Sequence, residues 1–558
     1  MAAPQEDQTQ PEHPNTVSAA YDDGMEKPED SQSEKEEAET PRSVSPPNRH
    51  SGEEEKSDVR EDGKRELKEE DAYDCLAYSW PTWKKCMYLA SVAVIQIAMN
   101  YNTSVYPNVV TQLTEQFALD KQGARTGQMI YLIFYSFGCE LWAPWSEEFG
   151  RWPILMLSEA LICIWTCPKR LLPTLAAFLP AAGLSTAGGS VTLGLIADLY
   201  QPDEQQWPLA FIVLASCIGT SIGGVVGGPV ERFLEWRWNF WIQLIFNAGA
   251  MCIFFFMPES RSTIMLDKEA KRRRKTGEDP NIYGPNELKK PRISIGEMAT
   301  VWIRPWRMLV TEPIVLCLSL LSGFSDALIF TFLESFAIVY NQWDFGTLAV
   351  AWAFIPINAA YFIAYFTYYP WFMRDDHLRR TKGSSSMYPE RRLKWLLWTA
   401  PLEPIGLFGF AWTTLGPSVV HWIVPMIFAA LVGIANYTIY FSSVDYMVAA
   451  YGVYSASACG GNAWARDFFA GISAMYASPL YHNLGESPNP AVNYATTLLA
   501  AISCVVVIPI YVFYWFGPQI RDRSKFAKSL AADREATNGR RISKASNLPE
   551  GHNVNESV

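Results

Sequence analysis

The sequence predicts an all-α membrane protein with twelve transmembrane helices, arranged as two halves of six. Three observations predict this fold class. Of the 558 residues, 49% are hydrophobic and only 18% are charged. Apolar runs of roughly 20 residues, the length that crosses a hydrocarbon core of about 30 Å, recur along most of the chain. A basic stretch with 12 Lys/Arg, between Glu259 and Glu312, separates the first six runs from the last six.

The first element is an acidic tail over residues 1–78, which we expect to be disordered. Residues 1–71 hold 9 Lys/Arg against 22 Asp/Glu, a balance of −13, whereas the whole chain carries −11. Such a segment has too little apolar surface to offset the entropy of folding. The rest of the chain is therefore close to neutral, and no basic domain suggests a nucleic-acid partner. Residues 521–558 are expected to form a second disordered tail.

The two membrane halves follow in order, with the basic stretch between them. We expect the first half over residues 79–258, a basic loop over 259–312, and the second half over 313–520. The expected spans are Cys86–Asn108, Gln128–Trp145, Pro153–Cys167, Leu171–Ala197, Trp207–Val230, Trp238–Pro258, Ile314–Tyr340, Ala349–Met373, Lys394–Thr414, Ser418–Ser443, Ala456–Leu480 and Asn493–Ile520.

The loops between the spans indicate an orientation. The connection from Arg374 to Lys394 holds seven Lys/Arg, whereas the connections at 341–346, 416–421 and 481–490 hold none. Because basic loops stay in the cytoplasm, this bias predicts that both termini and the central loop are cytoplasmic. We expect a monomer in the lipid bilayer, in the plasma membrane rather than the vacuolar membrane.

Several charged or polar residues lie inside expected spans. A charge at the bilayer centre costs about 2.5–3.5 kcal/mol on insertion scales, so these side chains should face the bundle interior or a wet cavity. Asp326 and Glu334 are eight residues apart and share one helix face. We take this set as a candidate pathway for substrate and protons: Glu140, Asp326, Glu334, Asn358, Glu403, Arg466 and Asp467.

Structural roles for some of these residues stay open. Arg466 and Asp467 are neighbours and point about 100° apart, so Asp467 could instead bond to another span. Glu403 lies near the start of its span and could be a half-buried interface residue.

Glycines in the fifth expected span form two stripes with a spacing of four. Small residues at this spacing let helix backbones approach closely. We expect a packing role for Gly219, Gly223, Gly224, Gly227 and Gly228.

Family motifs appear at three places in the chain. The segment from Gly138 to Pro153 reads G-C-E-L-W-A-P-W-S-E-E-F-G-R-W-P. It resembles the signature loop of the major facilitator superfamily, in its branch of twelve-span fungal drug:proton antiporters, which includes polyamine and multidrug exporters. Stretches beginning at Pro258 and at Pro389 resemble two further loops of these transporters. The resemblance spans residues 80–525 and implies a cytoplasmic gate formed by Glu147, Gly150, Arg151, Glu259, Arg261, Glu390 and Arg392.

The sequence departs from this family at two points. The fifth span lacks the usual proline between its glycines, and Pro229 follows them instead. The segment Trp165–Gly183 contains three prolines and lacks the arginine that the family links to proton coupling. We explain the second departure either by a local error in the gene model or by a real loss of coupling.

The leading functional hypothesis is proton-coupled efflux of small amphipathic organic molecules such as drugs, polyamines or secondary metabolites, by alternating access. Proton-coupled uptake on the same scaffold, and a sensor that resembles a transporter without transporting, are the alternatives. No catalytic motif supports an enzyme, and we expect neither a cofactor nor a metal site.

Overall fold

The protein is described here from a computed structural model. The described residues are 64–527, with gaps at 167–174, 187, 202–203, 289–294, 383–387, 485–487 and 525. The chain divides into a unit of residues 1–57 and a unit of residues 58–558, and every described residue belongs to the second. The expected tail up to residue 63, and most of the expected tail after residue 521, lie outside the described residues.

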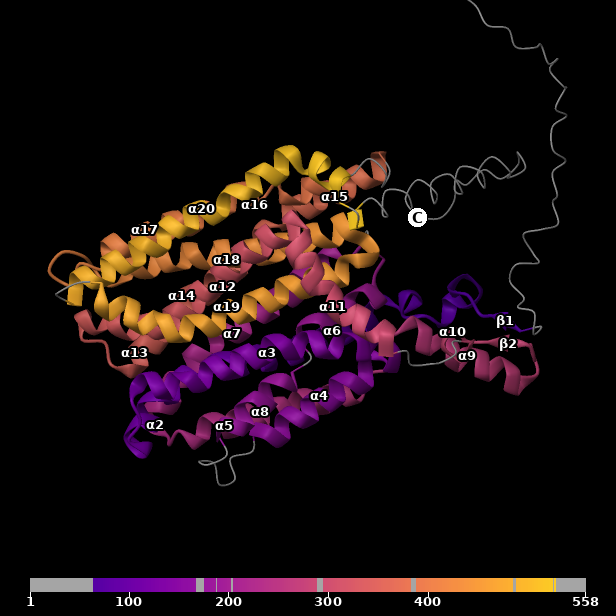
Figure 1. The fold of residues 1–558 in the computed structure, drawn as a ribbon, viewed down its shortest axis with the longest axis horizontal. Helices are drawn as coiled ribbons and strands as arrows, with labels where there is room; N and C mark the ends of the chain where they lie inside the picture. The colour runs from indigo at the N-terminus through magenta and orange to yellow at the C-terminus, as the bar shows by residue number, and fades with distance from the viewer. Residues whose placement is uncertain are drawn as a thin grey trace, which may run out of the picture. The chain divides into compact units, whose positions relative to one another are not determined.

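The N-terminal half consists of six helical rods in the described part of the chain (Figure 1). One rod is built from two helices, α5 and α6, which meet near Ser185. A short helix, α2 (Val110–Phe117), follows the 3₁₀ turn η3 (Tyr106–Val109). The rods are α1 (Thr82–Ser104), α3 (Lys121–Phe149), α4 (Arg151–Thr166), α5 (Leu175–Leu184) with α6 (Gly188–Leu199), α7 (Gln206–Phe233) and α8 (Arg237–Phe255).

The C-terminal half also has six rods in its described residues, and prolines divide two of them. Breaks occur before Pro356, Pro370 and near Pro401, where proline removes a helical hydrogen bond. The rods are α12 (Pro313–Tyr340), α13–α15 (Thr347–Trp352, Ile355–Thr367, Tyr369–Lys382), α16–α17 (Leu396–Thr399, Leu402–Thr413), α18 (Ile423–Tyr451), α19 (Ser455–Asn483) and α20 (Pro488–Arg523). Among its described residues, three 3₁₀ turns lie between the helices: η4 (Asn341–Trp343), η6 (Pro389–Leu393) and η7 (Gly452–Tyr454).

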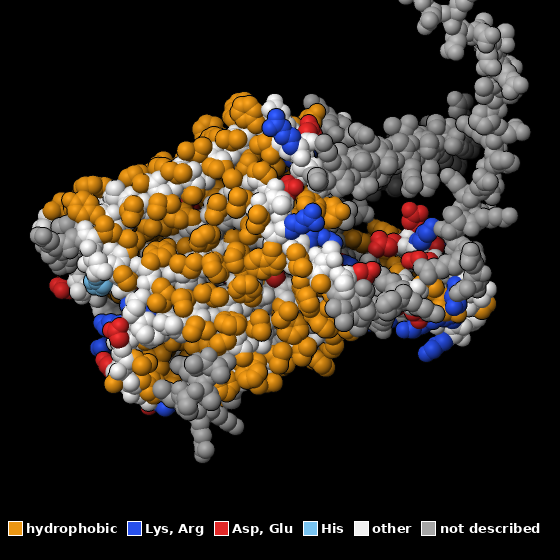
Figure 2. Space-filling model, viewed as in Figure 1, with side chains coloured by type: hydrophobic (Ala, Val, Ile, Leu, Met, Phe, Trp, Pro, Cys, Tyr) orange, Lys and Arg blue, Asp and Glu red, His pale blue; other side chains and the backbone are white. Residues whose placement is uncertain are grey.

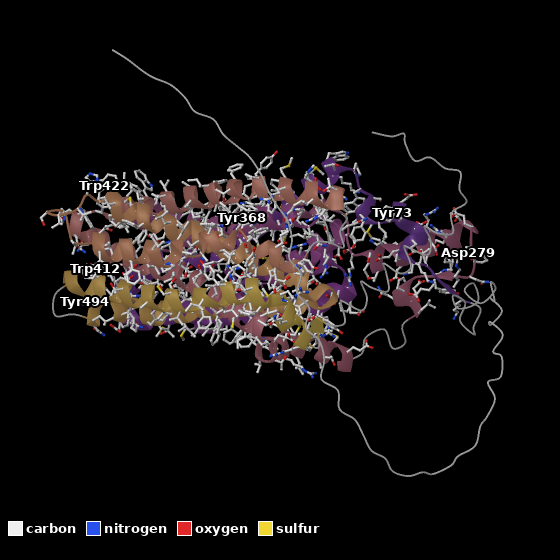
Figure 3. All side chains as sticks on the ribbon, turned by 90° about the horizontal axis from the view of Figure 1, so that it is seen from above. Tyr73, Asp279, Tyr368, Trp412, Trp422 and Tyr494 are labelled. Carbon is white, nitrogen blue, oxygen red and sulfur yellow. The ribbon has the colours of Figure 1, made fainter. Side chains whose placement is uncertain are left out.

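Apolar side chains cover the sides of the bundle, as expected for a membrane protein. Figure 2 shows hydrophobic side chains over the sides of the helices and charged ones gathered near the two ends. Among the described residues, six helical segments are long and apolar enough to cross a membrane by length and composition alone. Trp412, Trp422 and Tyr494 lie together at one end and are exposed (Figure 3), where aromatic side chains suit a membrane interface.

We call the end of the bundle at which α15 lies the basal end, and the end at which α2 and α13 lie the distal end (Figure 1). The predicted all-α fold with two six-helix halves is confirmed.

The central connection is more structured than the predicted basic loop. It contains α9 (Ser262–Thr276), β2 (Ile282–Tyr283), α10 (Pro285–Leu288) and α11 (Ile295–Thr311). Helix α11 packs against both α3 and α19, and the indole of Trp302 donates a 3.1 Å hydrogen bond to the carbonyl of Leu141. The ring of Trp306 contacts those of Phe137 and Trp464 at centroid distances of 5.5 and 4.6 Å.

The expected tail boundary at residue 78 also differs from the structure. Residues 64–79 form β1 (Arg65–Glu66) and the 3₁₀ turns η1 (Glu69–Cys75) and η2 (Ala77–Ser79). Strand β1 pairs in parallel with β2, and a small apolar core joins the two segments: Leu67, Ala72, Leu76, Leu266, Ala270 and Ile282. We call residues 64–79 with 262–288 the basal module. Its apolar residues are spaced too sparsely to predict folding from either segment alone.

Candidate functional site

A large cavity lies between the two halves at the distal end. Its volume is about 860 Å³, and its walls come from α3, α7 and η3 on one side and from α12, α13 and α19 on the other. Exposed residues such as Lys121 and Asn341 form its rim. Small-molecule sites typically occupy about 300–1,000 Å³, so this vestibule is large enough for an organic substrate.

An ion pair joins the two halves in the wall of the vestibule. The Nε of Arg125 on α3 donates a 2.8 Å hydrogen bond to the carboxylate of Glu334 on α12. The second carboxylate oxygen of Glu334 is buried and has no hydrogen-bond partner among the described residues. Sequence analysis identified Glu334 but not Arg125, because Arg125 lies only four residues into its helix and resembles an ordinary helix-end cation.

Asp326 faces a different helix from Glu334, although both lie on α12. Arg466 of α19 donates a 3.1 Å hydrogen bond to Asp326, and its guanidinium lies 3.4 Å from the ring centre of Tyr440. The pair is therefore internal to the C-terminal half. Asp326 and Glu334 share a helix face, as their spacing requires, but each has its own cation.

Glu140 and Asp467 are acids from opposite halves. Glu140 lies on α3 and is buried against Gly460 of α19, so closely that a Cβ atom at Gly460 would lie 2.6 Å from either carboxylate oxygen. The charge of Asp467 acts on Glu140, whereas the charges that act on Asp467 are those of Arg466 and Asp326. Neither carboxylate forms an ion pair with a described residue.

Two further predicted residues make neutral contacts. Glu403 is fully buried and accepts hydrogen bonds from the hydroxyls of Ser325 and Ser503 within the C-terminal half. Asn358 on α14 accepts a 2.7 Å hydrogen bond from Ser221 on α7, so it joins the two halves.

The basal end is closed by polar contacts across the halves. Gln206 on α7 donates a 3.1 Å hydrogen bond to Asp445 on α18 and accepts a 2.7 Å bond from Arg379 on α15. Arg392 binds the same carboxylate of Asp445. With the vestibule hollow at the other end, the structure records a conformation that is closed basally.

The predicted gate residues of the N-terminal half gather at the basal end. Arg151 binds Asp198 at 2.8 Å, and Arg261 binds the same carboxylate at 3.1 Å. Glu259 accepts hydrogen bonds from the backbone N–H groups of Arg151 and Arg261, each at 2.9 Å. Asp198 is thus the centre of this cluster, and sequence analysis missed it because it lies at the end of a long apolar run.

Gly150 and Glu147, two further predicted gate residues, lie beside this cluster. Gly150 has a φ of 106°, which favours glycine, and a Cβ atom there would lie 2.4 Å from Glu259. Glu147 makes no ion pair with a described residue, although its charge acts on Arg151.

In the C-terminal half, Glu390 binds Arg521 of α20 through two hydrogen bonds of 2.7 and 3.1 Å. Both residues lie in the same half, so this contact ties a loop to the last helix and does not cross the interface.

The glycine stripes of α7 face two different partners. Gly219, Gly223 and Gly227 lie against α1 and its following turn, whereas Gly224 and Gly228 lie against side chains of the C-terminal half. The two stripes therefore serve packing within a half and across the interface.

Comparison with known proteins gives the family. The model of the Major Facilitator Superfamily matches residues 90–466. "Transporter mfs1" of Schizosaccharomyces pombe is 28% identical over 462 residues, which cover 80% of this chain and 86% of that protein. The "Efflux pump atB" of Aspergillus terreus is 33% identical over 401 residues, covering 69% and 81%.

Solved structures support the same fold. The human organic anion transporter MFSD10 has a TM-score of 0.51 at 13% identity, with 77% of this chain and 100% of that chain covered. The proton:xylose symporter XylE of E. coli, bound to a deoxyglucose derivative, has a TM-score of 0.53 at 15% identity, covering 78% and 97%. The family match, the paired six-helix halves and the cavity between them lead to one conclusion: the chain is a multi-pass membrane transporter that belongs to the Major Facilitator Superfamily.

Proposed function

We propose that this transporter exports small amphipathic organic molecules in exchange for protons. The observation that carries the proposal is the vestibule of about 860 Å³, which both halves line and in whose wall Glu334 lies. A cavity shared by two halves can open to each side in turn when the halves rock against each other.

The acidic residues at the interface support proton exchange. Glu140 and Asp467 come from opposite halves, and the charge of Asp467 acts on Glu140. Glu334 has one carboxylate oxygen without a hydrogen-bond partner among the described residues. Two nearby carboxylates disfavour simultaneous ionisation, so a proton or a cationic group of the substrate would relieve their repulsion. Alternating access would change the distance between them.

Relatives support the direction of transport. The names "Efflux pump atB" and "Multidrug transporter TPO1_2", the latter from Candida glabrata, describe proteins that are 33% and 28% identical to this chain. On this proposal the basal end faces the cytoplasm, the distal vestibule opens outward at the plasma membrane, and one monomer forms the complete pathway.

The proposal is tested with purified protein in liposomes that contain rhodamine 6G, a fluorescent amphipathic cation. An imposed pH gradient should drive the dye in the direction opposite to proton flow. Glu334→Gln should reduce this pH-driven movement, whereas Glu115→Gln, at an exposed site on α2, should not.

The same assay separates the competing functions. Movement of the dye in the direction of proton flow would favour uptake. Movement that does not depend on the pH gradient would rule out proton-coupled transport. If a broad panel of dyes fails to move at all, the transporter-like sensor becomes the better hypothesis.

A further inference from the structure

The N-terminal half contains a buried acid that the central pathway does not use. Glu159 lies on α4 and is 0% exposed. Neither of its carboxylate oxygens has a hydrogen-bond partner in the part of the chain that the structure describes. It lines no part of the vestibule between the halves.

The surroundings of Glu159 offer no cation among the described residues. Helix α4 packs against α3, α5, α6 and α8. The described α5 side chains include no titratable group, and Asp198 of α6 is bound to Arg151 and Arg261. The charge of Glu159 acts on Tyr131 of α3 and on Cys163 of its own helix. Cys252 of α8 also acts electrostatically on Cys163. An ionised carboxylate is strongly disfavoured in such surroundings, so the neutral acid is the form that this site holds.

A stripe of amides leads from the distal end of the bundle toward this region. Asn239, Gln243 and Asn247 follow one another at a spacing of four, so they share one face of α8, and all three are buried. The opposite face is apolar and exposed, with Ile245 and Ile253. An amide face that points into the bundle while an apolar face points outward is expected where the interior carries water or polar ligands.

The stripe continues into the interior of the half. Asn247 and Asn102 of α1 form a reciprocal amide pair, with hydrogen bonds of 3.1 and 3.0 Å. Asn102 and Gln243 then border a cavity of about 30 Å³, whose lining has no residue in common with that of the vestibule. One water needs roughly 10–15 Å³ by this measure, so the cavity is large enough for about two.

The cavity lies between the amide stripe and the part of α4 that carries Glu159, which does not itself line it. Its wall includes Tyr131, on which the charge of Glu159 acts. It also includes Thr166, which lies two helical turns after Glu159 on the same face of α4. Polar groups thus extend from the distal end of α8 to the helix face that carries the acid.

We propose that Glu159 is a proton-binding site inside the N-terminal half, reached from the distal end through the amide stripe of α8 and separate from the vestibule. It would bind one proton on its carboxylate and release it along the same polar route. As a contribution to coupling, this inference rests on the proposed proton exchange; as a titrating site, it is testable without transport.

The direct test is carbodiimide labelling of the purified full-length protein, since dicyclohexylcarbodiimide reacts with protonated carboxyl groups in apolar surroundings. Mass spectrometry of the peptide that contains Glu159 should show modification at acidic pH that disappears at alkaline pH. Gln243→Leu, which removes one amide from the route, should slow the loss of reactivity toward newly added carbodiimide after a jump to alkaline pH. Labelling that is independent of pH, or no labelling at any pH, would overturn the proposal.

A second test uses transport and measures two quantities, pH-driven accumulation of a dye and exchange of the dye without a gradient. A variant that only disturbed the structure would lower both. Glu159→Gln keeps the shape of the side chain and cannot give up a proton. It should abolish pH-driven accumulation of rhodamine 6G while exchange of the dye without a gradient persists. Glu115→Gln is the exposed control, and Glu159→Gln with full pH-driven accumulation would contradict the proposed role.

The two experiments distinguish failure of the proposed transport function from failure of the proposed proton site at Glu159. If the parent protein shows no pH-driven transport, the proposed function fails and the labelling still decides whether Glu159 titrates. If transport follows the pH gradient and the labelling does not vary with pH, only the site at Glu159 is lost.

Discussion

Arg466 on α19 and Asp326 on α12 form a 3.1 Å ion pair whose side chains are only 8% and 9% exposed. Tyr440 covers the guanidinium and leaves little room for water. The net stabilisation that such a buried pair provides is smaller than the destabilisation that follows when one partner is removed and the other charge stays buried. The two residues are thus best regarded as one neutral unit that joins two helices of the C-terminal half.

This unit predicts a non-additive mutant cycle. Arg466→Gln and Asp326→Asn should each lower the free energy of unfolding by about 3–5 kcal/mol, because each leaves one buried charge uncompensated. The double variant should lose clearly less than the sum of the two. Thermal unfolding of the purified protein in one detergent measures all four members. Additive losses would show that the pair is not coupled.

The basal closure predicts a shift between conformations. Gln206→Ala removes the bonds to Asp445 and Arg379, and a hydrogen bond to a charged group is worth about 1.5–3 kcal/mol. The basally closed state should therefore become several-fold less populated. The reporter is a cysteine at Ala337, which lines the vestibule, in a chain whose exposed cysteines are serine.

Maleimide labelling of that cysteine in purified protein should become slower in the Gln206→Ala variant, because the vestibule would be open for less of the time. Gln201→Ala, at an exposed position in the loop before α7, is the matched control. Equal rates in the parent and the Gln206→Ala variant would show that these bonds do not hold the closure.

The basal module predicts a dependence on pH. Hydrogen bonds from Arg272, and then from Arg273, hold the pKa of Glu269 down to about 2. Because this value is below the unfolded value of about 4.3, the contribution of Glu269 to stability is present above that unfolded value. It is lost as the pH falls from there through about 2.

Hydrogen exchange of the Leu67 amide, which donates to the carbonyl of Tyr283, reports on the module. Its protection should fall on acidification, and Glu269→Gln should reduce it at neutral pH. The control Glu70→Gln, at an exposed position in η1, should leave it unchanged. Protection that does not differ between these two variants would rule out the ion cluster as the cause.

Much of the fold could be predicted from the sequence, because burying a backbone in lipid requires helices of a minimum length and apolar runs reveal them. Most of the charged residues inside spans were also visible, since each is costly there. Their pairing, and several of their partners, were not. Arg125 and Asp445 lie near helix ends, where charges are common, and Asp198 closes an apolar run. Pairing across such distances is decided by tertiary packing, which no local pattern records.

Glu159 was missed for a related reason. It lies inside the expected span Pro153–Cys167 as a single acid with no charged residue at a helical spacing that would pair with it. The amides of α8 are neutral, so a search for charges passes over them. The basal module was missed because its two strands are only two residues long and lie about 200 positions apart.

The glycines of α7 and α8 predict opposite results from the same substitution. A Cβ atom at Gly219 would lie 2.7 Å from the backbone carbonyl of Ile97, so Gly219→Ala forces α1 and α7 apart and should cost about 1–3 kcal/mol. Gly249 on α8 has no heavy atom within 4 Å of such a Cβ, so Gly249→Ala should stabilise the helix by about 0.5–1 kcal/mol. Thermal unfolding of both variants under the same conditions should therefore shift the midpoint down for the first and up for the second. If Gly219→Ala were as stable as the parent protein, close backbone approach could not be the reason for glycine at that position.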